Sequence, residues 1–295
     1  MTINSPRQLK DWINNRAKRD GVIANTLLQS FMMERLLERI AVSDYRDNFI
    51  LKGGFLIAAM IGIDMRSTMD MDTTIKGISI DQPEIQKILS EITSIDLEDH
   101  VNFNIKGIKS IHDTSEYDDF RVSLEVNFFT IKVNLKIDIT TGDVIIPGEV
   151  DYAYKLMFEE REISIKAYNL NTILAEKIES ILVRNISNTR ARDYYDLYIL
   201  IKLNHSMLDR DELKVAIRKK AEERASTKYV DDYVVYLESI SESQELRKIW
   251  NDYSKKYPYA ENIEFNQIIE TIWDLLASFT NEKKLANVSD ESVSV

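Results

Sequence analysis

Two aspartates, Asp70 and Asp72, have the residue type and spacing best suited to chemistry in this 295-residue chain. Apolar Met69 and Met71 alternate with them, and this period of two predicts a strand. Residues two apart on a strand point to the same face, about 7 Å apart, so the two carboxylates would lie side by side. Like charges held that close need a counter-cation. Mg²⁺ suits this role, because it prefers oxygen ligands and leaves coordination positions for substrate phosphates.

A third carboxylate on a neighbouring strand would complete a two-ion site, and Asp138 is the best candidate. Asp138 lies between Ile137 and Ile139 at the end of a predicted strand. In this hypothesis Asp138 holds the ion that activates an attacking hydroxyl, whereas Asp70 and Asp72 hold the ions that bind a triphosphate and stabilise its leaving group. The alternative is an ordinary strand with one solvated face, which a D-x-D pattern alone would favour.

A glycine pair precedes the two aspartates. Lys52-Gly53-Gly54 lies between the apolar run 49–51 and the apolar segment 55–63, and the three together predict a buried strand, a tight turn and a short helix. Glycines at such a turn let the backbone approach phosphate oxygens at the N-terminus of the helix. Glycine pairs are frequent at turns, so this feature supports a phosphate site only together with the carboxylates.

The segments 49–56 and 66–72 resemble the first motif of the AbiEii/AbiGii toxin family, whose members are nucleotidyltransferases of the DNA polymerase β type. That motif is a glycine-rich turn followed by D-x-D. Many polymerase β-like enzymes have Gly-Ser at the turn, where this chain has the K-G-G form that is common within the family. The resemblance implies that the nucleotide phosphates are bound by Lys52, Gly53, Gly54, Arg66 and Thr68, with Thr68 or Ser67 replacing the missing serine.

Two later segments, 174–178 and 190–198, resemble the family's other motifs, a lysine on one helix and an R-D-x-x-D-L-Y element on the next. The resemblance implies that Lys177 and Asp196 are catalytic and that Lys177, Arg192 and Asp193 contact the nucleotide.

From the residues alone, alternatives stay open for this second group. Lys177, at the edge of an apolar stripe, either binds a phosphate or covers the core with its stem. Asp196 lies among apolar neighbours and needs a partner, which could be Lys177, Arg190 or Arg192. Asp193 also fits a structural ion pair between helices.

The order of the predicted elements indicates an α+β fold. Helical spacing marks two helices in the first forty residues and another at 80–95, and strands are predicted at 49–51, 69–75, 101–111, 120–129 and 131–140. After Tyr168 the spacing is helical almost to the end. We therefore expect a polymerase β-like nucleotidyltransferase domain with a mixed or antiparallel sheet at residues 1–165, including the two N-terminal helices, then a helical domain at 166–281 and a flexible tail at 282–295.

Composition excludes several classes of site. The chain has no cysteine, which removes disulfides, thiolate metal sites and cysteine nucleophiles, and its three histidines lie far apart. It contains neither G-x-x-x-x-G-K-[ST] nor G-x-G-x-x-G. No segment has the ~18 consecutive apolar residues of a membrane span, and the first residues lack the apolar block of a secretion signal. We therefore expect a cytoplasmic protein without a membrane partner.

The charge balance limits how nucleic acid could bind. With 49 acidic and 38 basic residues the net charge is −11, so any contact with nucleic acid must be local and sensitive to salt. Two clusters are candidates for such a contact: Arg184, Arg190 and Arg192, and Arg218, Lys219 and Lys220. The second cluster is equally consistent with a solvated helix face.

The resemblance implies the toxin of a bacterial abortive-infection toxin–antitoxin pair, which halts growth and so limits phage. Its reaction would transfer NMP from an NTP to a hydroxyl and release pyrophosphate, with Mg²⁺ or Mn²⁺ as cofactor and the 3′ end of tRNA as acceptor. The antitoxin would act without a stable complex. Two rivals remain: a nucleotidyltransferase that modifies a protein hydroxyl, which the acidic net charge favours, and a noncatalytic module that binds a nucleotide or a partner.

Overall fold

The computed structural model describes residues 3–66, 68–111 and 119–291, with side chains as far as Phe279. The chain divides into two compact units. The N-terminal unit comprises Met1–Asp143 and Gly148–Tyr168, and the C-terminal unit comprises Val144–Pro147 and Asn169–Val295. A sheet with helices forms the first unit and helices form the second, which confirms the expected α+β fold.

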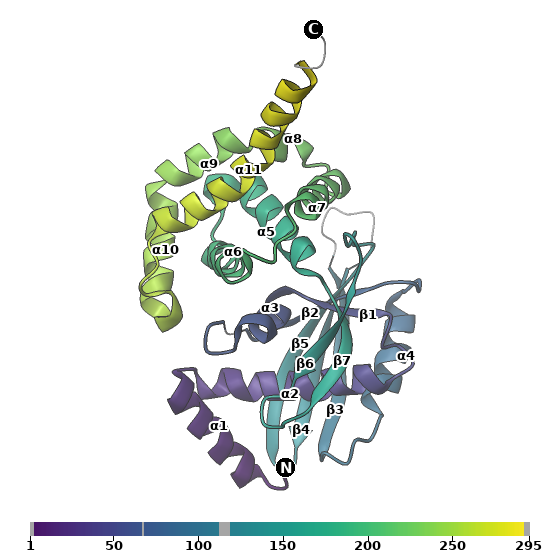
Figure 1. Cartoon of the computed structure of the whole chain (residues 1–295). Coiled ribbons are helices and arrows are strands. Elements are labelled where there is room, and N and C mark those ends of the chain that lie inside the picture. The colour runs from purple at the N-terminus through teal and green to yellow at the C-terminus, as the bar shows by residue number, and fades with distance from the viewer. Residues whose placement is uncertain (1–2, 67, 112–118, 292–295) are drawn as a thin grey trace. The chain divides into compact units, whose positions relative to one another are not determined.

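Seven strands in the described part of the N-terminal unit form one sheet (Figure 1). Their order is β3-β4-β5-β2-β1-β7-β6. The pairs β1·β7 and β2·β5 are parallel and the other neighbours are antiparallel, so the sheet is mixed, as expected. The strands are β1 (Phe49–Lys52), β2 (Met71–Ile75), β3 (Val101–Ile111), β4 (Asp119–Phe128), β5 (Ile131–Thr141), β6 (Val150–Lys155) and β7 (Glu162–Ala167).

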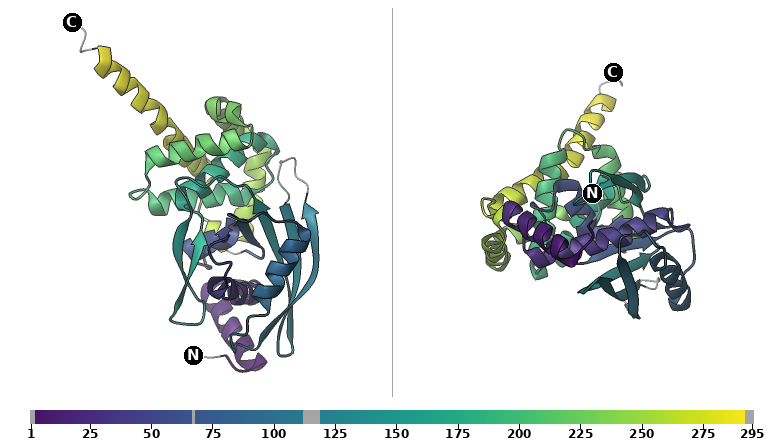
Figure 2. Two further views of the ribbon diagram at one scale, coloured as in Figure 1. Left: turned by 90° about the vertical axis from the view of Figure 1, so that its right-hand side faces the viewer. Right: turned by 90° about the horizontal axis from the view of Figure 1, so that it is seen from below.

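One face of the β3–β5 part of the sheet is packed and the other is polar. Along β5 the odd-numbered residues from Ile131 to Ile139 are buried, while Lys132, Asn134 and Lys136 are exposed. This alternation is typical of a sheet that is covered on one side. Helix α2 packs on β5 and β7 and on α1, and α4 packs on β3 (Figure 2). The helices of this unit are α1 (Pro6–Asp20), α2 (Ala24–Val42), α3 (Gly53–Ile61) and α4 (Gln82–Thr93).

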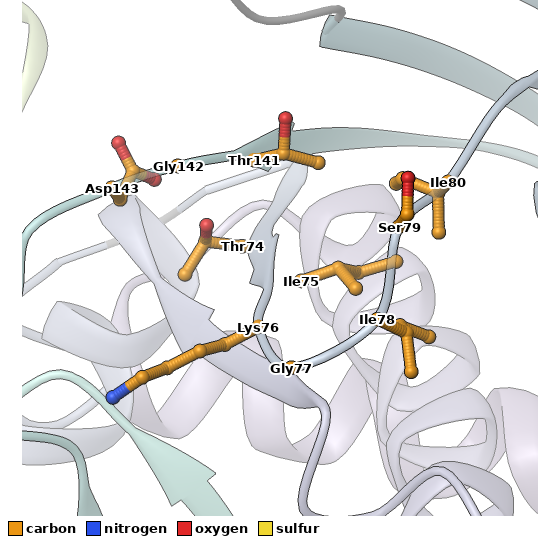
Figure 3. Close-up of a pocket in the computed structure, with 10 residues that line it drawn as sticks. All are labelled: Thr74, Ile75, Lys76, Gly77, Ile78, Ser79, Ile80, Thr141, Gly142 and Asp143. Atoms are coloured by element: carbon orange, nitrogen blue, oxygen red, sulfur yellow. The ribbon is translucent and has the colours of Figure 1, made fainter.

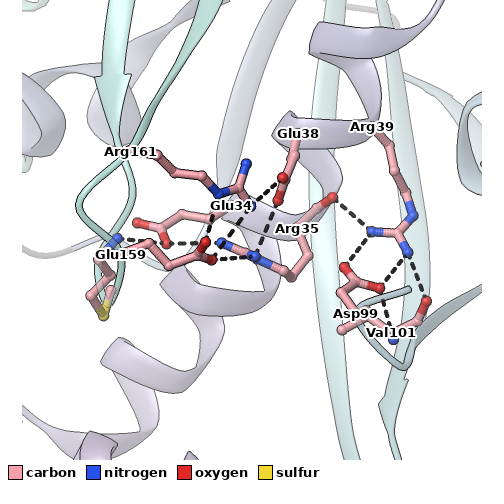
Figure 4. A network of polar contacts seen from close by, with 9 residues as sticks. Glu34, Arg35, Glu38, Arg39, Asp99, Val101, Glu159 and Arg161 are labelled. Carbon is pink, nitrogen blue, oxygen red and sulfur yellow. Dashed lines mark hydrogen bonds and ion pairs between the residues drawn. The ribbon is translucent and has the colours of Figure 1, made fainter. Parts of the chain in front are cut away.

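Helix α2 also buries charged side chains, which are paired. The Arg39 guanidinium donates to both carboxylate oxygens of Asp99, at 2.8 and 2.9 Å (Figure 4). Glu34 accepts a hydrogen bond from the Tyr154 hydroxyl at 3.1 Å, and burial raises the pKa of Glu34 to about 7. Because a buried charge is tolerated only with partners, this network ties α2 to strand β6 and to the residues just before β3.

The C-terminal unit is helical throughout its described regular elements. Helix α5 packs on α6 and α7, and α11 packs on α6. The helices are α5 (Leu170–Arg184), α6 (Ala191–Asn204), α7 (Arg210–Glu223), α8 (Thr227–Asp231), α9 (Tyr233–Glu242), α10 (Gln244–Lys256) and α11 (Phe265–Glu291), with short 3₁₀ turns at Asn185–Ser187 and Pro258–Ala260. Across the described ranges, none of the helices has both the length and the apolar character needed to cross a membrane.

Two features of this unit were not expected from the sequence. Helix α11 continues to Glu291, so regular structure extends into the segment from residue 282, whose flexibility stays a prediction. An α-helix satisfies its own backbone hydrogen bonds, so a polar segment can continue it without an apolar stripe. The segment Val144–Pro147 joins this unit because the Ile146 N–H donates to Thr172 Oγ1 at 3.1 Å and Asn169 donates to the Ile146 carbonyl at 2.8 Å. Such long-range bonds leave no local sequence pattern.

Candidate active site

Two of the three predicted carboxylates lie opposite each other on neighbouring strands. In the parallel pair β2·β5, Asp72 is the register partner of Asp138, and in the antiparallel pair β1·β2 it is the partner of Lys52. Directly opposed residues share one face of the sheet, about 5 Å apart. Strand β2 begins at Met71, so Asp70 lies just before the strand and not within it, where the alternation had placed it. Asp70 is exposed.

The electrostatics of Asp72 show that the three carboxylates act on one another. Burial raises the pKa of Asp72, and the negative charges of Asp138 and Asp70 raise it further. The Lys52 ammonium and a hydrogen bond from the Gly54 N–H act in the opposite direction. A negative charge at Asp72 is therefore costly in the folded chain, and a cation beside it would stabilise the ionised form.

The glycine turn packs directly against Asp72. Gly53 begins α3 with a φ of +65°, and a Cβ placed on it would lie 2.6 Å from Cγ of Asp72. A Cβ on Gly54 would lie 2.8 Å from Nη2 of Arg66 and 3.0 Å from Oγ1 of Thr68, and both of these side chains are buried. The turn thus requires glycine at position 53, where φ is positive and a Cβ would overlap Asp72, whereas a side chain at position 54 would displace the end of Arg66 and the Thr68 hydroxyl. Ser67 lies outside the described residues.

Lys52 is held at the end of β1 by a carboxylate that the sequence did not single out. Its ammonium lies 2.5 Å from Asp143 Oδ2, which also accepts from Thr140 Oγ1 at 2.6 Å. Asp143 also lines a pocket of about 450 Å³, together with residues 74–80, 141 and 142 (Figure 3). The only signal for Asp143 in the sequence was its place after the strand break at Thr141-Gly142.

Asp138 has a second partner that sequence reasoning missed. Arg121 is its register partner on β4, and the guanidinium donates to both oxygens: Nε to Oδ1 at 2.8 Å and Nη2 to Oδ2 at 2.7 Å. A two-bond pair of this kind is strong and fixes the carboxylate plane. No sequence pattern could have found Arg121, because its contact depends on the register of β4 against β5.

Asp70, Asp72 and Asp138 are residues of the type that binds a hard divalent cation, but their side chains are not arranged as a finished ligand set. Carboxylate oxygens are the ligands that Mg²⁺ and Mn²⁺ prefer, and Asp70, Asp72 and Asp138 lie close enough to raise one pKa together. Within the described residues, however, no three acidic or histidine side chains are arranged as a finished ligand set. Asp138 is turned toward Arg121. Binding of a cation by all three would require Asp138 to exchange its bonds to Arg121 for bonds to the metal.

The predicted residues of the C-terminal unit form a buried cluster of their own. The Lys177 ammonium lies 2.5 Å from Asp193 Oδ1 and 3.0 Å from Asp196 Oδ2, and both acids are buried. Of the three partners considered for Asp196, Lys177 makes this contact. Arg192 instead donates to the Tyr257 hydroxyl at 3.2 Å. The cluster joins α5 to α6 and has the geometry of the structural ion pair that was one alternative for Asp193.

The second basic cluster of the sequence is largely neutralised. Arg218 pairs with Asp231 at 2.5 Å, and Lys219 pairs with Glu222 at 2.8 Å. Lys220 is buried and lies 2.8 Å from Glu223. This cluster is therefore not the exposed basic surface that nucleic-acid binding would need.

Comparison with solved structures finds matches at low identity and with TM-scores below 0.5. The Helicobacter pylori protein JHP933 is 15% identical, with a TM-score of 0.49, over 90% of this chain and 97% of its own. A proposed nucleotidyltransferase of H. pylori is 17% identical, with a TM-score of 0.47, over 87% of this chain and 96% of its own. An antigenic nucleotidyltransferase-like protein of Paracoccidioides brasiliensis is 14% identical, with a TM-score of 0.39, over 68% of this chain and 90% of its own.

No curated protein is similar enough to this chain to match it. A protein family does match, over residues 35–277, and it is described as the nucleotidyl transferase AbiEii toxin of type IV toxin–antitoxin systems. The match includes the glycine turn, the three carboxylates and the Lys177 cluster. The chain therefore belongs to the AbiEii family and is a nucleotidyltransferase toxin of a type IV toxin–antitoxin system.

Proposed function

We propose that the chain transfers NMP from an NTP to the 3′ end of tRNA and that this reaction halts the growth of a phage-infected cell. Family membership supports NMP transfer. The proposed position of the site is supported by one observation: Asp72 and Asp138 lie opposite each other beside the glycine turn, and the pKa of Asp72 is raised. The acceptor is the one that the sequence resemblance implies.

In this proposal Asp70, Asp72 and Asp138 hold divalent cations, Mg²⁺ or Mn²⁺. When bound, these ions would supply positive charge to the attacking hydroxyl and to the triphosphate. The chain's own contribution is positioning. Asp72 is fixed by its burial, by the Lys52 charge and by the Gly54 N–H, so little reorganisation is needed when charge develops beside it.

Phosphate binding is assigned to the residues that surround Asp72. Lys52, Arg66 and Thr68 supply a cationic or hydroxyl group, and Gly53 and Gly54 allow close approach of the backbone. These groups are buried and lie next to the carboxylates, so water would compete weakly with a phosphate there.

The C-terminal cluster is assigned to the nucleotide from its sequence motifs. Lys177, Arg192, Asp193 and Asp196 match the later family motifs, and Lys177 with Asp196 is proposed to be catalytic. Their contacts fit a structural role as well, because Lys177 already joins two buried acids. A cognate antitoxin follows from the type IV assignment, and we propose that it neutralises the toxin without a stable complex.

The test is transfer of label from NTPs to separated pools of cellular RNA and protein. The native chain is compared with Asp72→Ala, Asp138→Ala and a matched control, Asp11→Ala, which removes an exposed carboxylate of the same unit. We expect label in the tRNA fraction, a roughly 100-fold or greater loss in the two site variants, and no loss in the control, since even partners of metal ligands contribute 10-fold to 100-fold.

Other outcomes would replace this proposal. Label in the protein pool would identify a protein hydroxyl as the acceptor. Growth arrest that persists in Asp72→Ala, without any labelled product, would identify a noncatalytic binding module. Thermal unfolding of each variant shows whether a loss of transfer is merely a loss of fold.

A further inference from the structure

The polar face of strands β3, β4 and β5 leads directly to the carboxylates. Its residues form four rows across the sheet, each with one residue from β3, one from β4 and one from β5. In order toward the carboxylates the rows are Asn102–Asn127–Lys132, Asn104–Glu125–Asn134, Gly107–Ser123–Lys136 and Lys109–Arg121–Asp138. The last row continues into Asp72 on β2. We call these outward positions, together with Lys106 in the bulge between Ile105 and Gly107, the open face. From Lys132 to Asp138 the open face extends for about 20 Å along β5.

The open face is accessible. Lys109, Lys132 and Lys136 are exposed, and the Arg121 side chain is 48% exposed. A Cβ placed on Gly107, on the edge strand β3, would meet no atom within 4 Å. The opposite side of the same strands carries the buried apolar residues, so one side of the sheet is apolar and packed and the other is polar and open.

Its charge is opposite to that of the chain as a whole. The acids Glu125 and Asp138 are matched by Lys106, at 3.3 Å, and by Arg121. Three further lysines, Lys109, Lys132 and Lys136, make no ion pair with any residue that the structure describes. A protein of net charge −11 thus carries three lysines outside these ion pairs on one side of its candidate site, although Lys106 and Lys132 both lower the pKa of Glu125.

The other outward residues are asparagine and serine: Asn102, Asn104, Ser123, Asn127 and Asn134. Lysine, asparagine and serine side chains on an open polar surface are typical of contacts to phosphate and sugar, which position a nucleic acid without reading its sequence. Asp119, at the start of β4, lies beyond the Asp138 row.

We propose that the open face binds the phosphodiester backbone of the acceptor RNA and guides its end to Asp72 and Asp138. The inference rests on the proposed function, because it assumes an RNA acceptor. It names a surface that neither basic cluster of the sequence indicated. The face is long enough for several nucleotides, so a short acceptor would use only the row nearest the carboxylates.

The test replaces Lys109, Lys132 and Lys136 together by glutamine. Arg121 is kept, because its loss would also free Asp138. The matched control is Lys10→Gln, Lys18→Gln and Lys155→Gln, which removes the same charge from exposed lysines of the same unit away from the open face. Steady-state transfer is measured against salt with full-length tRNA and with a trinucleotide that carries the same 3′ end.

We expect the open-face variant to raise KM for tRNA about tenfold or more at low salt. Its plot of log affinity against log salt should be shallower by about 2 to 3, since each lost phosphate contact removes ~0.7 to 0.9 from the slope. The values of kcat and KM for NTP should stay unchanged, as should every parameter of the control. KM for the trinucleotide should rise less than KM for tRNA, because the short acceptor can use only Lys109, the one replaced lysine in the row nearest the carboxylates. The single variants Lys132→Gln and Lys136→Gln should each show part of the effect, which keeps the test available if the triple variant does not fold.

Two results would overturn the inference. One is an open-face variant with the same KM and salt slope for tRNA as the control, although the native chain labels tRNA. The other is an equal loss with tRNA and with the trinucleotide, which would show damage to the site itself. Failure of the native chain to label any RNA would instead contradict the proposed function, and the two failures are therefore distinguishable.

Discussion

Alanine at Gly53 should damage both stability and catalysis, by amounts that follow from its geometry. A side chain at the φ of +65° costs roughly 1–2 kcal/mol. The new Cβ would also lie 2.6 Å from Asp72 Cγ, so the carboxylate must move by about 1 Å to reach an ordinary contact. Overpacking of this kind costs a further ~1–3 kcal/mol, and a displacement of about 1 Å at a reacting group can lower the rate about 100-fold.

Gly21 is the matched control for this substitution. It has the same φ of +65°, at the end of α1, and a Cβ there would meet nothing within 4 Å. Gly21→Ala therefore carries the backbone cost alone. The difference between the two variants isolates the contact with Asp72.

The assays are urea unfolding for stability and kcat of NMP transfer for catalysis. We expect Gly21→Ala to lose roughly 1–2 kcal/mol of unfolding free energy with an unchanged kcat, and Gly53→Ala to lose more and to transfer about 100-fold more slowly. If Gly53→Ala matched Gly21→Ala in both measurements, Asp72 would not be packed against the glycine turn in the working enzyme, and the assignment of this turn would be wrong.

Three further predictions concern buried charges. The pKa of Asp72 is raised in the folded chain. In metal-free buffer the stability that protonated Asp72 contributes is therefore complete below the ordinary pKa of 3.8 and is lost as pH rises through the pKa of the folded state. Asp72→Asn should remove this part of the pH dependence of thermal unfolding and raise stability at neutral pH. Glu34, with a pKa of about 7, should make stability fall between pH 4.5 and about 7, and Glu34→Gln should flatten that fall; an unchanged profile would contradict the burial of Glu34. Lys177→Met removes the ammonium beside buried Asp193 and Asp196 and should cost roughly 3–5 kcal/mol in urea unfolding. A loss below about 1 kcal/mol would show that the cluster is not structural.

The parts of the fold set by local pattern were predictable from the sequence. Alternation predicted the strands at 101–111, 120–129 and 131–140; the observed β3 has these bounds, and β4 and β5 differ by one residue at their ends. Asp138 could be selected as the third acid because it follows that alternation at a strand end. Its pairing with Asp72 could not be derived, since register between distant strands is set by the whole sheet.

The partners of the site were not predictable. Arg121 and Asp143 meet Asp138 and Lys52 only because β4, β5 and β1 are placed as they are. The open face was not predictable for a related reason. A basic cluster on a helix or loop comes from residues close together in sequence, whereas a sheet brings together lysines from alternate positions of several strands. The second cluster of the sequence falls on helix α7, where acids three residues away pair with Lys219 and Lys220.

The most direct test of the account compares NTP labelled in the α-phosphate with NTP labelled in the γ-phosphate, with native chain, Mg²⁺ and tRNA. The account predicts that α-label enters the tRNA, that γ-label leaves as pyrophosphate, and that Asp72→Asn and Asp138→Asn abolish both. Transfer of γ-label to the acceptor, or undiminished transfer of α-label by the two variants, would contradict the claim that these opposed carboxylates form the nucleotidyltransferase site.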